Sequence, residues 1–173
     1  VSFHQELPDI GAVLYPMLAP NRRAERQFET VRKMMPWLEV DLDRTLDLTG
    51  FEEHGKFLEG TGSLIFDRRS KVVFAHESPR TSPVVLDEFC KQTGYKPVLF
   101  HAFDSYDRPI YHTNVVMSIG DGFSVIALEA IRDRTERRNV QQWLRDLDLE
   151  VVDITLPQLN VFCGNVLEVK STD

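Results

Sequence analysis

The sequence predicts an α+β domain built from a repeated unit of two strands, a helix and a third strand. Three helical patterns alternate with short apolar runs, and two pairs of these runs are joined by turn residues typical of hairpins. The segments GAVLYPML, KVVFAHES and SVIALEAI recur at intervals of about 50–60 residues, and a helical pattern follows each of them. This internal repeat predicts a single domain over residues 1–173, with three modules and the start of a fourth.

Two hairpins and two later strands define the sheets of the complete modules. The run GSLIFDRRSKVVFAH is predicted to turn at residues 67–70, and NVVMSIGDGFSVIAL is predicted to turn at the Gly-Asp-Gly of 120–122. After the helix of each module comes another apolar run, KPVLF at 96–100 and LEVVDITL at 149–156. Each module is therefore expected to close with a third strand.

The helices are predicted from capping residues and apolar periodicity. The first is expected to follow an N-cap at Asn21, and the second runs from an N-cap at Ser82 to a stop at Gly94. The third opens with Asp133 and Glu136, which resemble a capping box. Their apolar stripes are Ala24, Phe28, Val31 and Met35 in the first helix, Val85, Leu86, Phe89 and Cys90 in the second, and Val140, Trp143, Leu144 and Leu147 in the third.

Both ends of the chain are expected to interrupt a module. Only VSFHQELPDI precedes GAVLYPML, so the first module is predicted to lack its opening strand. The last residues, FCGNVLEVKSTD, are predicted to begin a fourth hairpin that does not close. An unpaired terminal strand is a poor way to end a domain. We therefore expect a domain truncated at both ends, whose exposed edge contacts a remainder of the protein or a second copy in a homo-oligomer.

Composition excludes several classes of partner. The net charge of −7 and the pI near 5.2 argue against binding to nucleic acid, which requires a basic face. No apolar run approaches the roughly 18–20 residues that span a bilayer, so no membrane association is expected. Cys90 and Cys163 form no Cys-x-x-Cys pair, which argues against disulfides and thiolate zinc sites. A reducing, cytoplasmic location without a metal or cofactor is the expectation.

Two polar residues occupy equivalent positions in successive repeats. Glu59 lies in LEGTGSLIF and His112 in YHTNVVMSI, each just before a predicted strand. If the modules pack around a common axis, these side chains meet. A carboxylate that orients an imidazole is typical of general acid and base chemistry. Gly60 and Gly62 would then leave room for a substrate to approach the backbone.

Simpler interpretations of these residues stay open on local sequence alone. Glu59 beside a glycine-rich turn could be a solvated carboxylate, and His112 could be a turn histidine bonded to backbone. A metal hydrolase using His4, His101, Asp104 or His112 is disfavoured, because these residues show no compact ligand spacing. The matching positions in two repeats favour the paired interpretation.

Four ordered motifs carry a resemblance to a known family. FLEGTGS, SPRT at 78–81, YHTNV at 111–115 and FCGNVLEV at 162–169 are similar to the amidinotransferase-related branch of the guanidino-modifying, or pentein, superfamily, near citrulline hydrolases and arginine deiminases. The resemblance covers essentially the whole chain. It implies a fan of ββαβ modules around a central polar site, of which this chain would be an incomplete portion. It also implies hydrolysis of a non-peptide C–N bond of a guanidino or ureido amino acid.

The resemblance implies a role for each matching residue. Glu59 would orient the histidine, and His112 would be the general acid and base. Arg80 would grip the α-carboxylate of the substrate, a task suited to its guanidinium fork. Gly60, Thr61 and Asn114 would line the substrate site. Asn114 stands where deiminases carry an aspartate, and a neutral amide suits the ureido group of citrulline better than the cationic guanidinium of arginine.

The nucleophile is the main departure from the family pattern. Family members carry a catalytic cysteine well beyond the Cys-Gly-Asn motif, so we expect the nucleophile to lie outside this chain and the chain alone to be inactive. Cys163 is expected to be a buried small residue rather than the nucleophile, and Cys90 to belong to the core. The alternative is a non-catalytic module of the same fold that binds a ligand or a partner.

Overall fold

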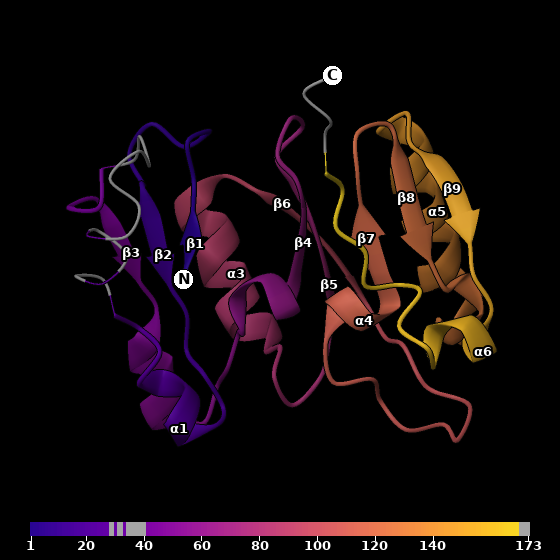
Figure 1. Ribbon diagram of the computed structural model, residues 1–173, viewed down its shortest axis with the longest axis horizontal. Coiled ribbons are helices and arrows are strands. Elements are labelled where there is room, and N and C mark those ends of the chain that lie inside the picture. Colours follow the sequence, from indigo (N-terminus) through magenta and orange to yellow (C-terminus); the bar gives the residue numbers. More distant parts are fainter. Residues whose placement is uncertain (28–29, 31–32, 34–40, 170–173) are drawn as a thin grey trace.

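The computed structural model describes residues 1–27, 30, 33 and 41–169. Three small sheets lie side by side along the long axis of the molecule (Figure 1). In each sheet the middle strand pairs antiparallel with the strand before it and parallel with the strand after it. A parallel pair requires a crossover connection, which is where the helices lie. The predicted ββαβ repeat is therefore the architecture of the chain.

The first sheet corrects the expectation that its opening strand is missing. Strand β1 (Ser2–Phe3) pairs antiparallel with β2 (Ala12–Leu14), and β2 pairs parallel with β3 (Thr45–Asp47). A strand of two residues is too short to show alternating hydrophobicity, so pattern analysis had no signal to detect. The VSFHQ segment supplies the missing strand.

The second module follows its prediction closely. Strands β4 (Leu64–Asp67) and β5 (Val72–His76) form the hairpin, helix α3 (Pro83–Thr93) crosses over, and β6 (Lys96–Phe100) pairs parallel with β5. Every residue of β5 is buried, as expected for a central strand. Helix α3 has Ser82 as its N-cap residue and ends at Gly94, whose φ of 75° is the left-handed conformation that favours glycine. Its buried residues include the whole predicted stripe, Cys90 among them.

The third module consists of α4 (Thr113–Val116), β7 (Met117–Ile119), β8 (Phe123–Ile126), α5 (Arg134–Asp146) and β9 (Glu150–Asp153). Asp133 caps α5 by accepting hydrogen bonds from the backbone N–H groups of Thr135 and Glu136. The capping box is only half formed, because the Glu136 carboxylate instead accepts from the backbone N–H of His101 at 2.8 Å. On the predicted stripe Val140, Leu144 and Leu147 are buried, whereas Trp143 is only partly covered.

The predicted start of the first helix needs correction. Helix α1 (Pro20–Arg23) has Ala19 as its N-cap residue, so Asn21 lies inside the first turn. Proline is well suited to that first turn, because its missing N–H has no helical partner to lose. Of the predicted first stripe, Ala24 follows the helix, and Phe28, Val31 and Met35 lie outside the described residues.

The segment 162–169 is not the strand that was predicted. After helix α6 (Leu156–Leu159), which begins within the predicted final strand, residues 162–169 form turns and irregular backbone. Asp121 donates its backbone N–H to the Glu168 carboxylate at 2.8 Å. This contact holds the segment beside the β7–β8 turn (Figure 1).

Two apolar clusters join the modules into one body. One cluster contains Val13 and Tyr15 of the first module together with the buried face of α3, and the other joins the second and third sheets under α5. Strand β4 lies beside β7 without pairing to it. Short 3-10 helices cover Thr49–His54, Gly60–Gly62 and Leu128–Ala130. No helix in the described ranges is both long and apolar enough to cross a membrane.

Candidate active site

Glu59 and His112 meet where β4 and β7 begin. Glu59 precedes the 3-10 turn Gly60–Gly62 that leads into β4, and His112 is the N-cap residue of α4, which leads into β7. Because β4 and β7 lie side by side, the two equivalent positions become neighbours. His112 Nε2 lies 2.7 Å from Glu59 Oε2. Glu59 and His112 occupy equivalent positions in successive modules. Although they lie 53 positions apart in the chain, they therefore share a hydrogen bond.

The Glu59 carboxylate has further partners from distant segments. The backbone N–H of Leu18 donates to Oε1 at 3.0 Å, and Arg80 Nη1 donates to Oε2 at 3.3 Å. Glu59 is 8% exposed. A buried carboxylate is tolerated when its oxygens accept several hydrogen bonds. These contacts fix the orientation of the carboxylate before it meets the imidazole.

Two buried hydroxyl groups hold the loops around the pair. Ser63 Oγ accepts from the backbone N–H of Glu59 at 2.9 Å and donates to the carbonyl of Arg80 at 2.9 Å. Thr113 Oγ1 donates to the carbonyl of Ser63 at 2.6 Å and accepts from the backbone N–H of His76 at 2.8 Å. Sequence analysis singled out neither residue. Their nearness in the sequence could have indicated a role at the site, since Ser63 and Thr113 lie within four residues of Glu59 and His112 respectively.

The glycines beside Glu59 make room for the protein's own side chains. A Cβ atom on Gly62 would stand 2.8 Å from Cε1 of His112. Gly60 has a φ of 54°, and a Cβ there would stand 3.1 Å from the Tyr15 ring. The predicted space for a substrate above these two residues is therefore occupied by an imidazole and a phenol. Gly62 allows the close approach of the histidine.

Burial favours the neutral form of His112. Burial lowers the pKa of His112, against the hydrogen bond and charge of Glu59, which raise it. The nearby charge of Arg80 lowers this pKa further. Nε2–H donates to the carboxylate, so Nδ1 carries the lone pair of the neutral ring. Among the described residues Nδ1 has no hydrogen-bond partner. The imidazole is thus oriented at one nitrogen and available at the other.

Arg80 and Tyr111 complete the surroundings of the pair. The Arg80 guanidinium carbon lies 5.5 Å from the centre of the Tyr111 ring, within cation–π range. The same ring lies 4.9 Å from the His112 ring, and Tyr111 is 48% exposed. The structure therefore brings Glu59, His112 and Arg80 into one cluster, with Tyr111 as a neighbour that sequence analysis missed.

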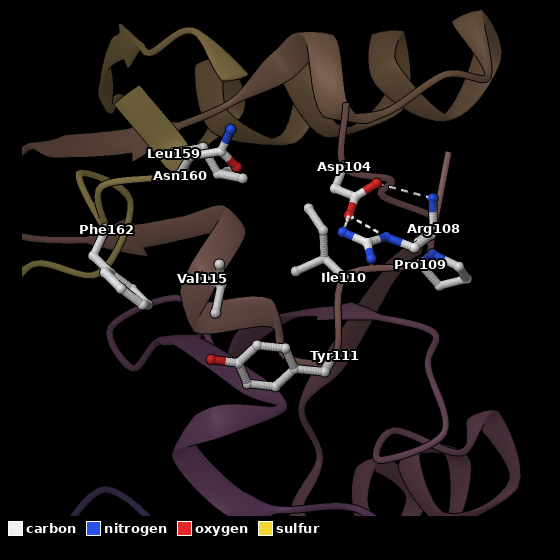
Figure 2. A pocket seen from close by; sticks show the side chains of 9 residues that line it. All are labelled: Asp104, Arg108, Pro109, Ile110, Tyr111, Val115, Leu159, Asn160 and Phe162. Atoms are coloured by element: carbon white, nitrogen blue, oxygen red, sulfur yellow. Dashed lines mark hydrogen bonds and ion pairs between the residues drawn. The ribbon is translucent and has the colours of Figure 1, made fainter. Parts of the chain in front are cut away.

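Tyr111 also lines an apolar cavity of about 400 Å³. Figure 2 shows its ring and that of Phe162 approaching Val115 from different segments, while the ion pair of Asp104 with Arg108 closes another side. Phe162 has a φ of 66°, unusual for a residue with a large side chain. The apolar walls suit hydrocarbon rather than a polar head group.

Thr61 and Asn114 lie in a different cavity. This space of about 470 Å³ is bounded by β4, β7 and residues 165–167. It adjoins the candidate pair, because Thr61 precedes Gly62 and Asn114 is the second residue after His112. Of the predicted substrate residues, Thr61 and Asn114 are therefore together, Arg80 is with Glu59, and Gly60 is covered by Tyr15.

The two cysteines differ in environment. Cys90 is buried in the α3 core, and burial raises the pKa of its thiol to about 12. Cys163 is exposed, which corrects the expectation of a buried residue. It lies in the turn after α6 rather than in a strand, and side chains of such turns face solvent. In the described part of the chain neither thiol forms a hydrogen bond with Glu59 or His112.

The residues considered for a metal have other partners. His4 contacts Glu6, His101 contacts Glu77 and Glu136, and Asp104 contacts Arg108. The described residues contain no group of three or more His, Cys, Asp or Glu side chains that could hold a metal ion.

Comparison with known proteins places the chain in a family. Residues 3–173 match the family model described as N,N dimethylarginine dimethylhydrolase, eukaryotic. The chain belongs to this family. It is thus a member of the guanidino-modifying pentein superfamily, as the motif resemblance indicated. No curated protein sequence matches the chain.

Solved structures with a similar fold extend this result. The apo structure of ArgZ, an arginine dihydrolase from the ornithine-ammonia cycle in Cyanobacteria, has a TM-score of 0.66 and 16% identity over 94% of this chain and 24% of its own. The N-terminal domain of ArgZ bound to product has a TM-score of 0.67 and 16% identity, over 95% and 54% of the two chains. The ternary complex of AgrE with ornithine and NAD+ has a TM-score of 0.69 and 17% identity, over 95% and 22%.

These similarities establish the fold of this chain. The three sheets of ββαβ modules are of the pentein type, as the sequence predicted. The chain spans about a quarter of the length of ArgZ and about half of its N-terminal domain. At these identities the comparison concerns the fold, and the chemistry has to be argued from the residues of this chain.

Proposed function

We propose that this chain forms part of a hydrolase acting on a non-peptide C–N bond of a guanidino or ureido amino acid. The observation that carries the proposal is the 2.7 Å contact of His112 Nε2 with Glu59, which leaves Nδ1 without a described protein partner. A histidine held by a carboxylate at one nitrogen can exchange a proton at the other. Membership of the dimethylarginine dimethylhydrolase family supports this class of substrate.

The proposed reaction is covalent. A cysteine, proposed to lie outside residues 1–173, passes its thiol proton to Nδ1 of neutral His112, and the resulting thiolate attacks the central carbon of the substrate and forms a C–S bond. The C–N bond then breaks, and His112 donates its proton to the leaving amine. His112 next takes a proton from water, whose oxygen attacks the same carbon while the C–S bond breaks. The thiolate is thereby regenerated, and the histidine carries the proton for the next cycle.

Glu59 and Arg80 have supporting roles in this proposal. Glu59 holds the imidazole in one orientation and stabilises its protonated form, which donates in the first step and is restored in the second. Arg80 donates to Glu59 through Nη1, and its other guanidinium nitrogens have no hydrogen-bond partner in the described part of the chain. They are available to bind the α-carboxylate of a substrate, for which a guanidinium is well matched.

Asn114 directs the choice of substrate. Its carboxamide can both donate to and accept from a neutral ureido group, but it cannot neutralise a buried guanidinium. We therefore propose citrulline as a better substrate than arginine. The alternative is a module that binds such a ligand without cleaving it. The burial of Cys90 and the lack of a hydrogen bond from Cys163 to His112 or Glu59 favour that alternative if no further cysteine takes part.

Turnover assays on the full-length protein test the proposal. We expect ammonia, ornithine and carbon dioxide from citrulline, because the carbamate left by cleavage of one C–N bond loses CO2, and we expect less activity on arginine. Glu59→Gln should lower turnover strongly, whereas Glu77→Gln, which removes a carboxylate from the exposed His101, should leave turnover unchanged. Asn114→Asp should shift the preference toward arginine. Binding of citrulline without ammonia release in the wild type would favour the non-catalytic module.

A further inference from the structure

The segment that carries His112 is held by the residue at the end of β5. Strand β5 ends at His76, beside helix α4, whose N-cap residue is His112 (Figure 1). The backbone N–H of His76 donates to Thr113 Oγ1 at 2.8 Å, and its Nε2 atom lies 2.6 Å from the carbonyl oxygen of Ile110. His76 therefore contacts the chain on both sides of His112, and the proposed reaction gives it no role.

The hydrogen bonds of the His76 ring fix its tautomer. The backbone N–H of Ala102 points to Nδ1 at 2.9 Å. A backbone N–H can only donate, so Nδ1 accepts this bond and carries the lone pair of the ring. The proton of the neutral ring is therefore on Nε2, which donates it to the Ile110 carbonyl. Burial lowers the pKa of His76, which favours this neutral form.

The same ring closes the base of the loop between Ala102 and Ile110. Ile110 donates its backbone N–H to the carbonyl of Ala102 at 3.1 Å, and both residues are buried. In the described part of the chain, His76 alone pairs with the Ala102 N–H and with the Ile110 carbonyl. Buried backbone groups are costly to leave unpaired. The ring thus fixes the point where the chain leaves this loop, two residues before His112.

A neighbouring contact shows why burial matters for this role. Ser78 Oγ donates to the carbonyl of Tyr111 at 2.8 Å, but this hydrogen bond is exposed to solvent. Water can replace an exposed donor, whereas the His76 imidazole is 0% exposed and has no such substitute. The backbone before His112 is therefore held more firmly by His76 than by Ser78.

The contact of His112 with Glu59 depends on this backbone. The two side chains come from different modules, and Nε2 lies 2.7 Å from the carboxylate. A shift of about 1 Å would take the pair out of the usual range of a hydrogen bond, and a displacement of this size in a catalytic group can cost about 100-fold in rate. Among the described residues His76 forms no hydrogen bond with Glu59 or with the His112 ring. Any effect of His76 on the pair is therefore transmitted through the backbone.

We propose that His76 is a positioning residue for His112. By donating to the Ile110 carbonyl, it fixes the backbone from which the imidazole of His112 reaches Glu59. The inference rests on the proposed function and adds to it a residue of the second module that controls the placement of the general acid and base in the third. Neutral histidine suits this position, because one rigid ring supplies an acceptor for Ala102 and a donor for Ile110.

Two substitutions at His76 separate its two ring hydrogen bonds. The carboxamide of Asn lies as many bonds from Cβ as Nδ1 does, so His76→Asn keeps an acceptor for Ala102 and loses the donor to Ile110. The carboxamide of Gln lies as many bonds from Cβ as Nε2 does, so His76→Gln keeps the donor and loses the acceptor. Each variant leaves one buried backbone group unpaired, so their melting temperatures should fall by similar amounts.

Steady-state kinetics of the full-length protein with citrulline measure the effect on His112. We expect His76→Asn to lower kcat by about 100-fold with KM unchanged. His76→Gln, the conservative variant, should retain most of the wild-type kcat. The control is His4→Asn, which changes a buried imidazole in the first module that is also hydrogen-bonded at both nitrogens. It should lower the melting temperature without changing kcat.

Other results would overturn the inference in distinguishable ways. Equal loss of kcat in His76→Asn and His76→Gln, or an unchanged kcat in His76→Asn, would refute the positioning role, while Glu59-dependent turnover by the wild type would leave the proposed function standing. Loss of folding in His76→Asn, alone or together with His76→Gln, would assign His76 to stability and would also refute it. A wild-type protein that cleaves neither citrulline nor arginine would refute both the inference and the proposed function.

Discussion

Two histidine–carboxylate pairs in this molecule have the same contact distance and different surroundings. His4 Nδ1 lies 2.7 Å from Glu6, and His112 Nε2 lies 2.7 Å from Glu59. The second nitrogen of His4 contacts Ser2 Oγ at 2.6 Å, and its side chain is fully buried. His112 keeps 16% of its side chain exposed and has no described partner for its second nitrogen. The free nitrogen, rather than the pairing, is what makes a histidine suitable for proton transfer.

The His4 pair is part of a network that joins two modules. Glu6 also accepts from Tyr95 at 2.6 Å and from Arg68 at 2.7 Å, both in the second module. Burial alone would raise the pKa of Glu6, but the hydrogen bonds from Tyr95 and His4 and the charge of Arg68 lower it to about 2. The carboxylate therefore stays charged at neutral pH and holds the two modules together.

The two histidine–carboxylate pairs are expected to differ most when the imidazole of each is removed. His112→Ala should lower turnover of citrulline by about 10²–10⁴-fold, the usual contribution of general acid and base catalysis, while the melting temperature stays close to that of the wild type. His4→Ala should do the reverse, because it removes a fully buried imidazole that hydrogen-bonds both Glu6 and Ser2. Steady-state kinetics and thermal melting measure the two effects. Full activity of His112→Ala would remove the basis of the proposed function.

The Glu6 network can be weakened without changing shape. Glu6→Gln replaces a charged acceptor shared by Tyr95, Arg68 and His4, so the free energy of unfolding should fall by about 2–3 kcal/mol. Urea denaturation measures this change. Glu77→Gln is the control, because Glu77 is exposed in its pair with His101 and such pairs contribute about 0–1 kcal/mol. Equal effects of the two variants would contradict the joining role of Glu6.

Gly62 offers a way to disturb the imidazole alone. A methyl group on Gly62 would collide with His112, so Gly62→Ala should reduce turnover by about 100-fold, the cost of a displacement near 1 Å. Gly50→Ala is the control, since nothing lies within 4 Å of the Cβ position there. The ratio of kcat to KM in both variants tests the expectation, and similar values would show that His112 tolerates the shift.

The last prediction concerns the pH dependence of stability. Burial lowers the pKa of His4, His76 and His112, so the folded protein binds fewer protons at these sites than the unfolded chain does. Stability should therefore fall as the pH drops below about 6.5, by at most about 1.4 kcal/mol per pH unit for each group. Glu136 raises the pKa of His101, which acts in the opposite direction. Urea denaturation at pH 7.5 and 5.5 would show the loss, and His101→Gln should make it steeper.

The sequence predicted features whose signals are local or repeated. Helix α3 was identified because Ser82, Pro83 and Gly94 mark its ends within the segment itself. The meeting of Glu59 and His112 followed from their matching positions in two modules. The contact of Leu18 with Glu59 was not predictable in this way, because the donor is a backbone N–H, which every residue except proline carries. Strand β1 was too short to detect.

Local composition led to a wrong secondary-structure prediction where a segment does not follow the repeated module. The run around Cys163 resembled the start of a strand, and the structure instead forms a turn that exposes the thiol. Gly60 and Gly62 were predicted to leave room for a substrate, and in the structure the side chains nearest their Cβ positions are those of Tyr15 and His112. Glycine in a sequence indicates that something comes near, without indicating what.

The Glu59 carboxylate takes hydrogen bonds from Leu18 in the first module and His112 in the third, while its own backbone belongs to the second. Each hairpin is a local structure that can form early, whereas contacts across 41 and 53 residues require longer loops to close. In refolding, recovery of circular dichroism should therefore precede recovery of the acid–imidazole contact. A chain caught part-way through folding would have most of its secondary structure and none of its chemistry.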